Sequence, residues 1–234
     1  MKDKINYWAI AVYYIIAVIC RYLTKKGDLL NGISNEYVKS ILTGVGPALG
    51  AVFVFSVFNI KPFMTLKGNY RNIIFPMALY WAFPVIFITT VTYFLNGTLP
   101  YIAVFSVLMY GLFEEVGWRG FLYQELKGLS TFLNIFIVSV LWYVWHLDFE
   151  WSFVHLSFFA IVIVGSWGIG KVADATNSLL AVSAFHSLNN FFRHIHAVNG
   201  LILGILLTSW ILILVVCKQM REKHQNSQVA KRAG

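Results

Sequence analysis

The sequence predicts an all-α protein, a polytopic membrane bundle of about eight transmembrane helices that enclose an intramembrane cavity. Composition is the first observation behind this fold class, because 59% of the 234 residues are hydrophobic and only 12% are charged. An ordinary soluble domain has about 25% charged residues, and the mean hydropathy of +0.70 points the same way. The second observation is that the apolar residues fall into repeated runs of membrane-spanning length. A soluble enzyme or a nucleic-acid binder is excluded by this pattern.

Each expected helix is an apolar run close to the roughly 20 residues that cross about 30 Å of hydrocarbon. The expected spans are 5–23, 38–59, 72–94, 101–123, 132–150, 153–171, 178–193 and 200–217. Short segments with turn-forming residues separate them, such as Asn96-Gly97. Residues 1–218 are therefore predicted to form a single membrane domain. The polar and basic stretch 219–234 is predicted to be a disordered tail.

Basic residues predict the orientation of the chain in the membrane. With the N-terminus inside, the inner segments hold twelve lysines and arginines and the outer segments hold five. The positive-inside rule then favours a multi-pass protein of the cell membrane with both termini in the cytoplasm. The first apolar run is expected to remain as a helix, since no small-residue cleavage site follows it. The net charge of +8 fits attraction to anionic lipid better than nucleic-acid binding.

Three charged residues interrupt the fourth expected span. Charged side chains at membrane depth cost roughly 2.5 to 3.5 kcal/mol each on insertion scales, and they usually mark a functional site. Arg119 follows Glu115 by four residues, a spacing that brings two side chains together on one face of a helix. We therefore expect Glu115 and Arg119 to form an ion pair. Glu114 differs from Glu115 by about 100° around the helix, so it is free to face another group.

Further polar residues occur in two later spans, at depths similar to that of Glu114. His146 lies in the span 132–150, and His186 and Asn190 lie four residues apart in the span 178–193. The second pair should project from one face of its helix and could donate hydrogen bonds to an oxyanion. A buried carboxylate beside a histidine suits general base chemistry on water. HExxH zinc helices and GxSxG nucleophile turns are missing from the sequence.

Simpler interpretations exist for each of these residues. The ion pair can be purely structural, and Glu114 can belong to a proton relay. His186 and Asn190 can act as polar contacts between helices. Two function classes therefore compete with an enzyme, namely a non-catalytic membrane immunity or scaffold protein and a proton-coupled transporter. A transporter predicts inverted repeats, and the sequence shows none.

Taken in order, the motifs resemble those of the CPBP intramembrane proteases. This family includes the CAAX prenyl endopeptidases and the bacterial Abi proteins of bacteriocin processing and immunity. The resemblance covers about residues 101–193 and rests on three motifs, which are Glu114-Glu115-x-x-x-Arg119, Trp142-x-x-x-His146 and His186-x-x-x-Asn190. Two departures occur within them. Trp142 stands where the family often has phenylalanine, and Gly117 lies inside the first motif, where it is expected to loosen a helical turn.

The resemblance implies a role for each motif residue. Glu114 and His146 would activate the attacking water, and His186 and Asn190 would stabilise the oxyanion. Glu115 and Arg119 would brace the site. The family has been described both as metalloproteases and as metal-independent glutamate proteases, and the side chains of Glu114, His146 and His186 are of the types that bind zinc. We expect no obligatory metal or other cofactor, because a carboxylate–histidine pair suffices to deprotonate water.

The resemblance also implies the substrate class and the surroundings. The expected activity is that of a CAAX-type or Abi-type intramembrane endopeptidase embedded in the lipid bilayer. Its substrate would be a membrane-associated peptide, either a prenylated CAAX C-terminus or a small secreted peptide such as a bacteriocin. Nucleic acid is not an expected partner.

Overall fold

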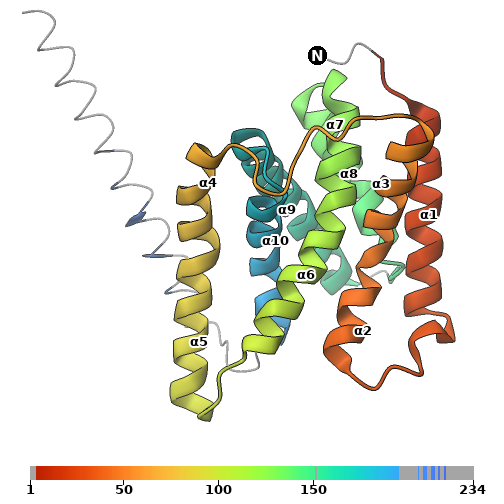
Figure 1. Cartoon of the computed structure of the whole chain (residues 1–234). Coiled ribbons are helices and arrows are strands. Elements are labelled where there is room, and N and C mark those ends of the chain that lie inside the picture. Colours follow the sequence, from red (N-terminus) through yellow and green to blue (C-terminus); the bar gives the residue numbers. More distant parts are fainter. Residues whose placement is uncertain are drawn as a thin grey trace, which may run out of the picture.

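The computed structural model describes residues 4–150 and 152–194 and, beyond them, residues 205, 208, 209, 212, 213, 216 and 219. All regular elements within the first two of these ranges are helices, which confirms the predicted fold class in its coarse form (Figure 1). The predicted eighth span, 200–217, and the tail 219–234 fall almost entirely outside the described residues. Both therefore stay predictions.

The first half of the chain contains five α-helices. They are α1 (Tyr7–Lys25), α2 (Glu36–Thr43), α3 (Val45–Val57), α4 (Tyr70–Met77) and α5 (Phe83–Asn96). A π-helical segment, Ala78–Ala82, joins α4 to α5 without a break. Helix α1 begins where the Asn6 side chain accepts a hydrogen bond from the backbone N–H of Ala9, an ordinary N-cap.

The second half contains the residues of the three motifs. Its helices are α6 (Tyr101–Gly117), α7 (Tyr123–Glu125), α8 (Thr131–Trp145), α9 (Phe153–Thr176) and α10 (Leu179–His194). A second π-helical segment, Trp118–Leu122, continues α6 into α7. Single turns of π-helix often occur at functional sites, and this one holds Arg119.

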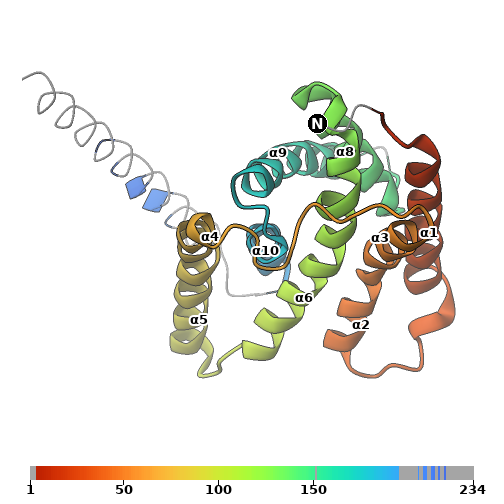
Figure 2. The ribbon, with the colours of Figure 1, turned by 45° about the horizontal axis from the view of Figure 1, so that its top comes forward.

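The helices alternate in direction between two ends of the bundle. Figures 1 and 2 show α1, α4–α5, α8 and α10 running away from the end at which the described chain begins, while α2–α3, α6 and α9 return to it. The end that holds the start of α1 is called the N-terminal end below. The ends of α1, α5 and α8 lie at the opposite end.

The predicted count of eight transmembrane helices is not confirmed. Three continuous helices are long and apolar enough to cross a membrane, namely Tyr7–Lys25, Tyr101–Gly128 and Phe153–Thr176. The pair α2–α3 becomes a fourth if its 41° bend is accepted within one span. The expected span 132–150 is wrong in its extent, because α8 has only 15 residues and ends at Trp145. At about 1.5 Å per residue such a helix covers about 22 Å. The apolar run in the sequence is therefore longer than the helix that it forms.

Close contacts between helices depend on glycines, as the spacing of Gly46 and Gly50 predicts. A Cβ atom at Gly46 would lie 2.9 Å from the Ala17 carbonyl oxygen, and one at Gly50 would lie 2.7 Å from that of Tyr13. Both glycines therefore let α3 pack directly on the backbone of α1. Gly117 has the same use, since a Cβ there would lie 2.5 Å from the carbonyl oxygen of Pro47. It sets α6 against α3, and the loosened turn expected there is the π-helical segment that follows.

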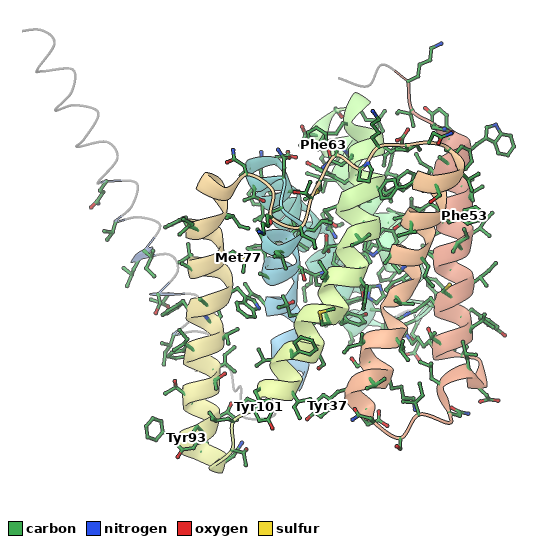
Figure 3. The ribbon with its side chains drawn as sticks, viewed as in Figure 1. Tyr37, Phe53, Phe63, Met77, Tyr93 and Tyr101 are labelled. Atoms are coloured by element: carbon green, nitrogen blue, oxygen red, sulfur yellow. The ribbon has the colours of Figure 1, made fainter. Side chains whose placement is uncertain are left out.

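Buried aromatic rings fix the motif helix against its neighbours. Trp118 is fully buried, and its ring contacts those of Tyr13 on α1 and Trp145 on α8 at centroid distances of 5.8 and 5.9 Å. Some exposed aromatic side chains lie near the ends of helices. Figure 3 shows Tyr37, Tyr93 and Tyr101 at the end opposite the start of α1. This distribution matches the aromatic belts of membrane proteins.

Candidate active site

The carboxylates of the first motif lie inside the protein. Glu114 and Glu115 occupy the last turn of α6 and are 1% and 0% exposed. Arg119, in the π-helical segment, is also fully buried. Its Nη1 donates to Glu115 Oε1 at 2.7 Å, and its Nη2 donates to the hydroxyl of Ser166 on α9 at 3.0 Å. The ion pair expected from the spacing is thus present, and it connects α6 to α9.

Glu115 also binds a histidine that the sequence did not assign to it. His186 Nδ1 lies 2.6 Å from Glu115 Oε1, the same oxygen that accepts from Arg119. A carboxylate in this position accepts the Nδ1–H, and the other ring nitrogen then points away from it. That nitrogen, Nε2, lies 3.9 Å from Glu114 Oε2. Glu115 therefore orients His186 towards Glu114, in addition to pairing with Arg119.

Glu114 is held by a residue whose role the sequence did not show. Trp142 Nε1 donates to Glu114 Oε2 at 2.8 Å. From the sequence, Trp142 was only an aromatic residue in the place of a phenylalanine. The signal was available, because an indole N–H is a donor that phenylalanine lacks and a buried indole usually finds an acceptor. Glu114 Oε1, by contrast, makes no hydrogen bond with any residue that the structure describes.

His146 lies at the end of α8, whereas the sequence placed it well inside a longer span. It is the C-cap residue, and Leu147 after it has a positive φ of 55°, which ends the helix. His146 Nδ1 is 2.8 Å from the carbonyl oxygen of Trp142, so a proton on Nδ1 leaves Nε2 as an acceptor. The His146 carbonyl oxygen accepts from Lys25 Nζ at 2.8 Å. Helix α1, which carries no motif residue, thereby fixes the backbone of His146.

One cavity brings the four predicted catalytic residues together. It has a volume of about 160 Å³ and is lined by Tyr110, Glu114, Trp142, His146, Phe158, Ile161, Val162, His186 and Asn190. Three helices were expected to contribute, and they do. The fourth contributor, α9, was missed by the sequence reasoning because its lining residues are ordinary apolar ones.

Asn190 completes the set of polar groups in this cavity. Its Nδ2 is buried and makes no hydrogen bond within the described part of the chain. Among the buried atoms that the structure describes, Glu114 Oε1 is thus an acceptor of this cavity without a partner, and Asn190 Nδ2 is a donor without one. Buried polar groups are almost always paired, and the pair left over here is available to a water molecule and a peptide group.

The described side chains do not form a metal site in this arrangement. Nowhere in the described ranges do three His, Cys, Asp or Glu side chains come together in a way that could hold a metal ion. One nitrogen of each cavity histidine is already engaged, His186 with Glu115 and His146 with a carbonyl oxygen. The expectation that no metal is obligatory stays a prediction.

The helices and the site together define a class of protein, an integral membrane protein with a buried carboxylate–histidine cavity. Residues 96–192 match a family model described as type II CAAX prenyl endopeptidase, Rce1-like. The matched segment contains all three motifs, so the resemblance of residues 96–192 to the CPBP and CAAX proteases is confirmed. The family is one of proteases, which supports a hydrolase. Comparison with curated proteins finds no match.

Proposed function

We propose that this protein is an intramembrane endopeptidase of the CAAX type. The observation that carries the proposal is the cavity of about 160 Å³ in which Glu114, His146, His186 and Asn190 meet. Glu114 contributes a buried acceptor without a partner in the described residues, and Asn190 contributes such a donor. An acceptor that takes a proton from water and donors that stabilise an oxyanion are the two requirements of peptide hydrolysis.

Glu114 acts as the base that activates water. Trp142 fixes Oε2, so Oε1 accepts the proton of a water molecule in the cavity that His146 also lines. The hydroxide attacks the carbonyl carbon of the scissile peptide and forms a tetrahedral intermediate. Glu114 then returns the proton to the departing amine nitrogen as the C–N bond breaks. The products are a carboxylic acid and an amine, and the enzyme recovers its starting state.

His186 and Asn190 stabilise the oxyanion of the intermediate. Nδ1 of His186 lies against Glu115, which directs Nε2 towards the cavity, where an Nε2–H would donate to the oxyanion. Asn190 adds its free Nδ2–H. Removing one such donor costs about 10²- to 10³-fold in kcat in an enzyme where this has been measured. Arg119 holds Glu115 in place, so its contribution is to position His186 rather than to touch the substrate.

A membrane-associated substrate fits the surroundings of the cavity. Ile161 lines the cavity and is also 49% exposed, so the cavity reaches the outer surface of α9. The rest of that surface is apolar, with Val164 and Leu156 exposed on either side of Ile161 in the sequence. A substrate anchored by a lipid group would approach along this apolar surface. We infer a prenylated CAAX C-terminus as the first substrate class and a small secreted peptide, as for the Abi branch, as the second.

The test is cleavage by purified protein in detergent, compared between wild type and Glu114→Gln. The panel contains a farnesylated CAAX peptide, the same peptide without the farnesyl group, and a bacteriocin-like peptide. Glu114→Gln keeps an oxygen acceptor for Trp142, so a folded but inactive variant is the expected result. Glu36→Gln, an exposed change on α2, is the matched control and should cleave normally.

Each outcome separates one alternative. Cleavage that persists in Glu114→Gln would contradict the mechanism. Absence of cleavage for every peptide, with wild type folded, would favour the immunity or scaffold protein. Loss of wild-type cleavage on adding a strong chelator, with restoration by zinc, would show that a metal is needed and would overturn the metal-free scheme.

A further inference from the structure

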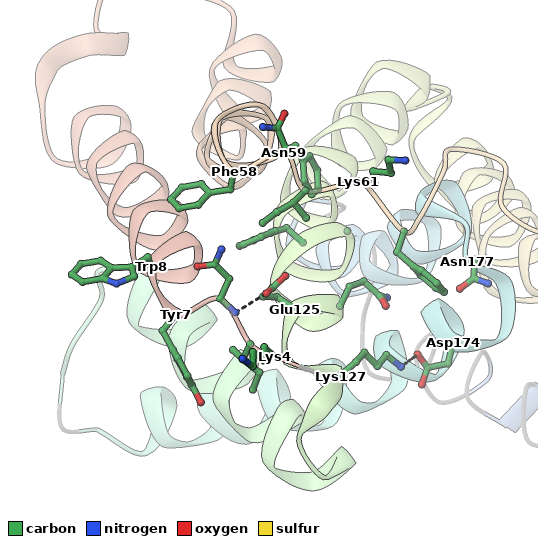
Figure 4. Close-up of a pocket in the computed structure, with 18 residues that line it drawn as sticks. Lys4, Tyr7, Trp8, Phe58, Asn59, Lys61, Glu125, Lys127, Asp174 and Asn177 are labelled. Carbon is green, nitrogen blue, oxygen red and sulfur yellow. Dashed lines mark hydrogen bonds and ion pairs between the residues drawn. The ribbon is translucent and has the colours of Figure 1, made fainter. Parts of the chain in front are cut away.

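A second and larger cavity lies at the N-terminal end of the bundle. It has a volume of about 1240 Å³ and is bounded by the segment that leads into α1, the end of α3 with the loop after it, the end of the α6–α7 helix and the turn between α9 and α10 (Figure 4). None of its lining residues lines the candidate active site. We call it the terminal cleft.

Most of the inner surface of the terminal cleft is apolar. Its lining includes Ile5, Phe55, Phe58, Ile60 and Phe121. Large exposed aromatic side chains stand at its edge, namely Tyr7 (70% exposed), Trp8 (79%) and Phe63 (63%). Figure 4 shows the Trp8 ring pointing outward from the other labelled residues. Aromatic rings of this kind are typical of the boundary between hydrocarbon and headgroups in a bilayer.

The carboxylates of the terminal cleft are engaged within the protein. Glu125 is 3% exposed and accepts from the backbone N–H of Asn6 at 2.8 Å. Asp174 accepts from the Tyr123 hydroxyl at 3.0 Å and forms an ion pair with Lys127. Asp174 is thus already paired with a cation, and Glu125 is buried and hydrogen-bonded within the protein.

Two lysines of the terminal cleft remain for a ligand. Lys4 and Lys61 are exposed, and neither makes a hydrogen bond or an ion pair with any residue in the described part of the chain. Figure 4 places them on different elements, Lys4 before α1 and Lys61 after α3. They supply positive charge to a cleft whose other surfaces are apolar or already paired.

The two ends of the bundle also differ in their balance of basic and acidic side chains. Counting only side chains that the structure describes, the N-terminal end holds Lys67 and Lys171 besides the cleft residues Lys4, Lys61 and Lys127, against the two cleft carboxylates Glu125 and Asp174. The opposite end holds Arg21, Lys25, Lys26 and Lys39 against four carboxylates, Asp28, Glu36, Asp148 and Glu150. A net positive end attracts anionic lipid, and by the positive-inside rule it faces the cytoplasm.

We propose that the terminal cleft binds an anionic phospholipid, with the phosphate of the headgroup between Lys4 and Lys61 and the upper part of the acyl chains against the phenylalanines. The lipid is favoured over a free phosphate because the cleft offers more apolar surface than charge. It is favoured over a soluble acidic ligand because the exposed aromatic edge belongs to the membrane boundary. The site is independent of the proposed peptidase activity and shares no residue with it.

The experiment measures binding to the purified full-length protein in a non-ionic detergent. The probes are short-chain phosphatidylglycerol, phosphatidylcholine with the same chains, and glycerol 3-phosphate. The readouts are the thermal unfolding midpoint and tryptophan fluorescence during titration. The test variant is Lys4→Ala/Lys61→Ala. The matched control is Lys67→Ala/Lys171→Ala, which removes the same charge from the same end without touching the cleft lining.

The expected result is saturable binding of phosphatidylglycerol that weakens about 30-fold in the test variant and less than about threefold in the control. The estimate follows from about 1 kcal/mol for each lysine near an anionic surface, converted at 1.4 kcal/mol per factor of ten. Equal weakening in both variants would overturn the site, because diffuse surface charge would explain it. Equally tight binding of glycerol 3-phosphate or of phosphatidylcholine would overturn the assignment of an anionic lipid.

Discussion

The candidate active site and the terminal cleft both lie against the α6–α7 helix, but their charged side chains differ in burial and in pairing. In the candidate active site, at Glu114, every charged group is buried and held by another side chain. In the terminal cleft, around Lys61, the carboxylates are paired and the remaining lysines are exposed. Burial is costly for an unpaired charge, so the small cavity needs a network of partners. Lys4 and Lys61 of the large one need no such partners, because water solvates them.

Substitutions in the buried network should affect catalysis, whereas substitutions in the terminal cleft should affect only the binding of lipid. A change in the buried network removes a partner from a group that water cannot reach. A change in the terminal cleft removes a charge that water already screens. The two regions should therefore respond independently, so that the untouched region serves as the control for a substitution in the other.

The largest effect is expected from Glu114→Gln. General base catalysis contributes about 10²- to 10⁴-fold, so kcat for the best peptide should fall by about that factor. The thermal midpoint and the response to phosphatidylglycerol should stay close to those of wild type. A parallel loss of lipid response would mean that the two regions are coupled through α6, and it would contradict their independence.

Arg119→Met should chiefly destabilise the protein. It leaves Glu115 buried beside His186 without its cation, and loss of one partner of a buried ion pair costs about 3–5 kcal/mol. The denaturation midpoint should fall accordingly. The double variant Arg119→Met/Glu115→Gln, which removes both charges, should recover part of that stability while remaining poorly active. No recovery in the double variant would show that Arg119 acts through its contact with Ser166 or through packing on Trp142 instead.

Trp142→Phe should lower cleavage while leaving most of the packing in place. It removes the N–H that binds Glu114, and a hydrogen bond to a charged group is worth about 1.5–3 kcal/mol, or about tenfold to a hundredfold in rate. The loss should appear in kcat more than in KM. Trp145→Phe makes the same chemical change outside the cavity, where Nε1 donates to the Ala17 carbonyl at 2.9 Å. It should reduce stability but not kcat, and equal kcat values for both variants would refute the role given to Trp142.

A smaller effect is expected from Lys25→Met. This change removes the donor that holds the His146 carbonyl, and a typical intramolecular hydrogen bond is worth about 1 kcal/mol, which corresponds to about fivefold. Lys25→Arg keeps a donor and should restore most of the activity. If methionine and arginine variants were equally slow, the amine would have no positioning function.

The smallest effect concerns pH and the loop after α8. The hydrogen bond from Lys25 holds the pKa of Asp148 below its ordinary value. A carboxyl with a lowered pKa in the folded state stabilises the protein above its unfolded pKa, about 3.9, and loses this contribution as the pH falls through the folded value. Thermal midpoints measured between pH 6 and 3 should therefore fall slightly more for wild type than for Asp148→Asn. Because Asp148 is half exposed, the difference should be small and should shrink in high salt.

Much of the active site was predictable from spacing alone. Helical geometry requires that Glu115 and Arg119 share a face and that Glu114 points elsewhere, and it requires the same of His186 and Asn190. The sequence of a single helix could not show which residues of other helices its charged side chains contact. The hydrogen bonds of Glu115 with His186 and of Glu114 with Trp142 join residues that are 71 and 28 positions apart. They exist only because four helices meet around one cavity.

By itself, then, the sequence determined the fold class, the membrane environment and the three motifs, because composition and helical periodicity are local properties. The tertiary structure decided the length of α8, the apolar contribution of α9 to the cavity and the contact of Lys25 with the backbone of His146. It also decided that Lys4 and Lys61, far apart in the chain, line one cleft. These features follow from how helices pack, and packing depends on glycine contacts and aromatic rings between segments that no local pattern connects.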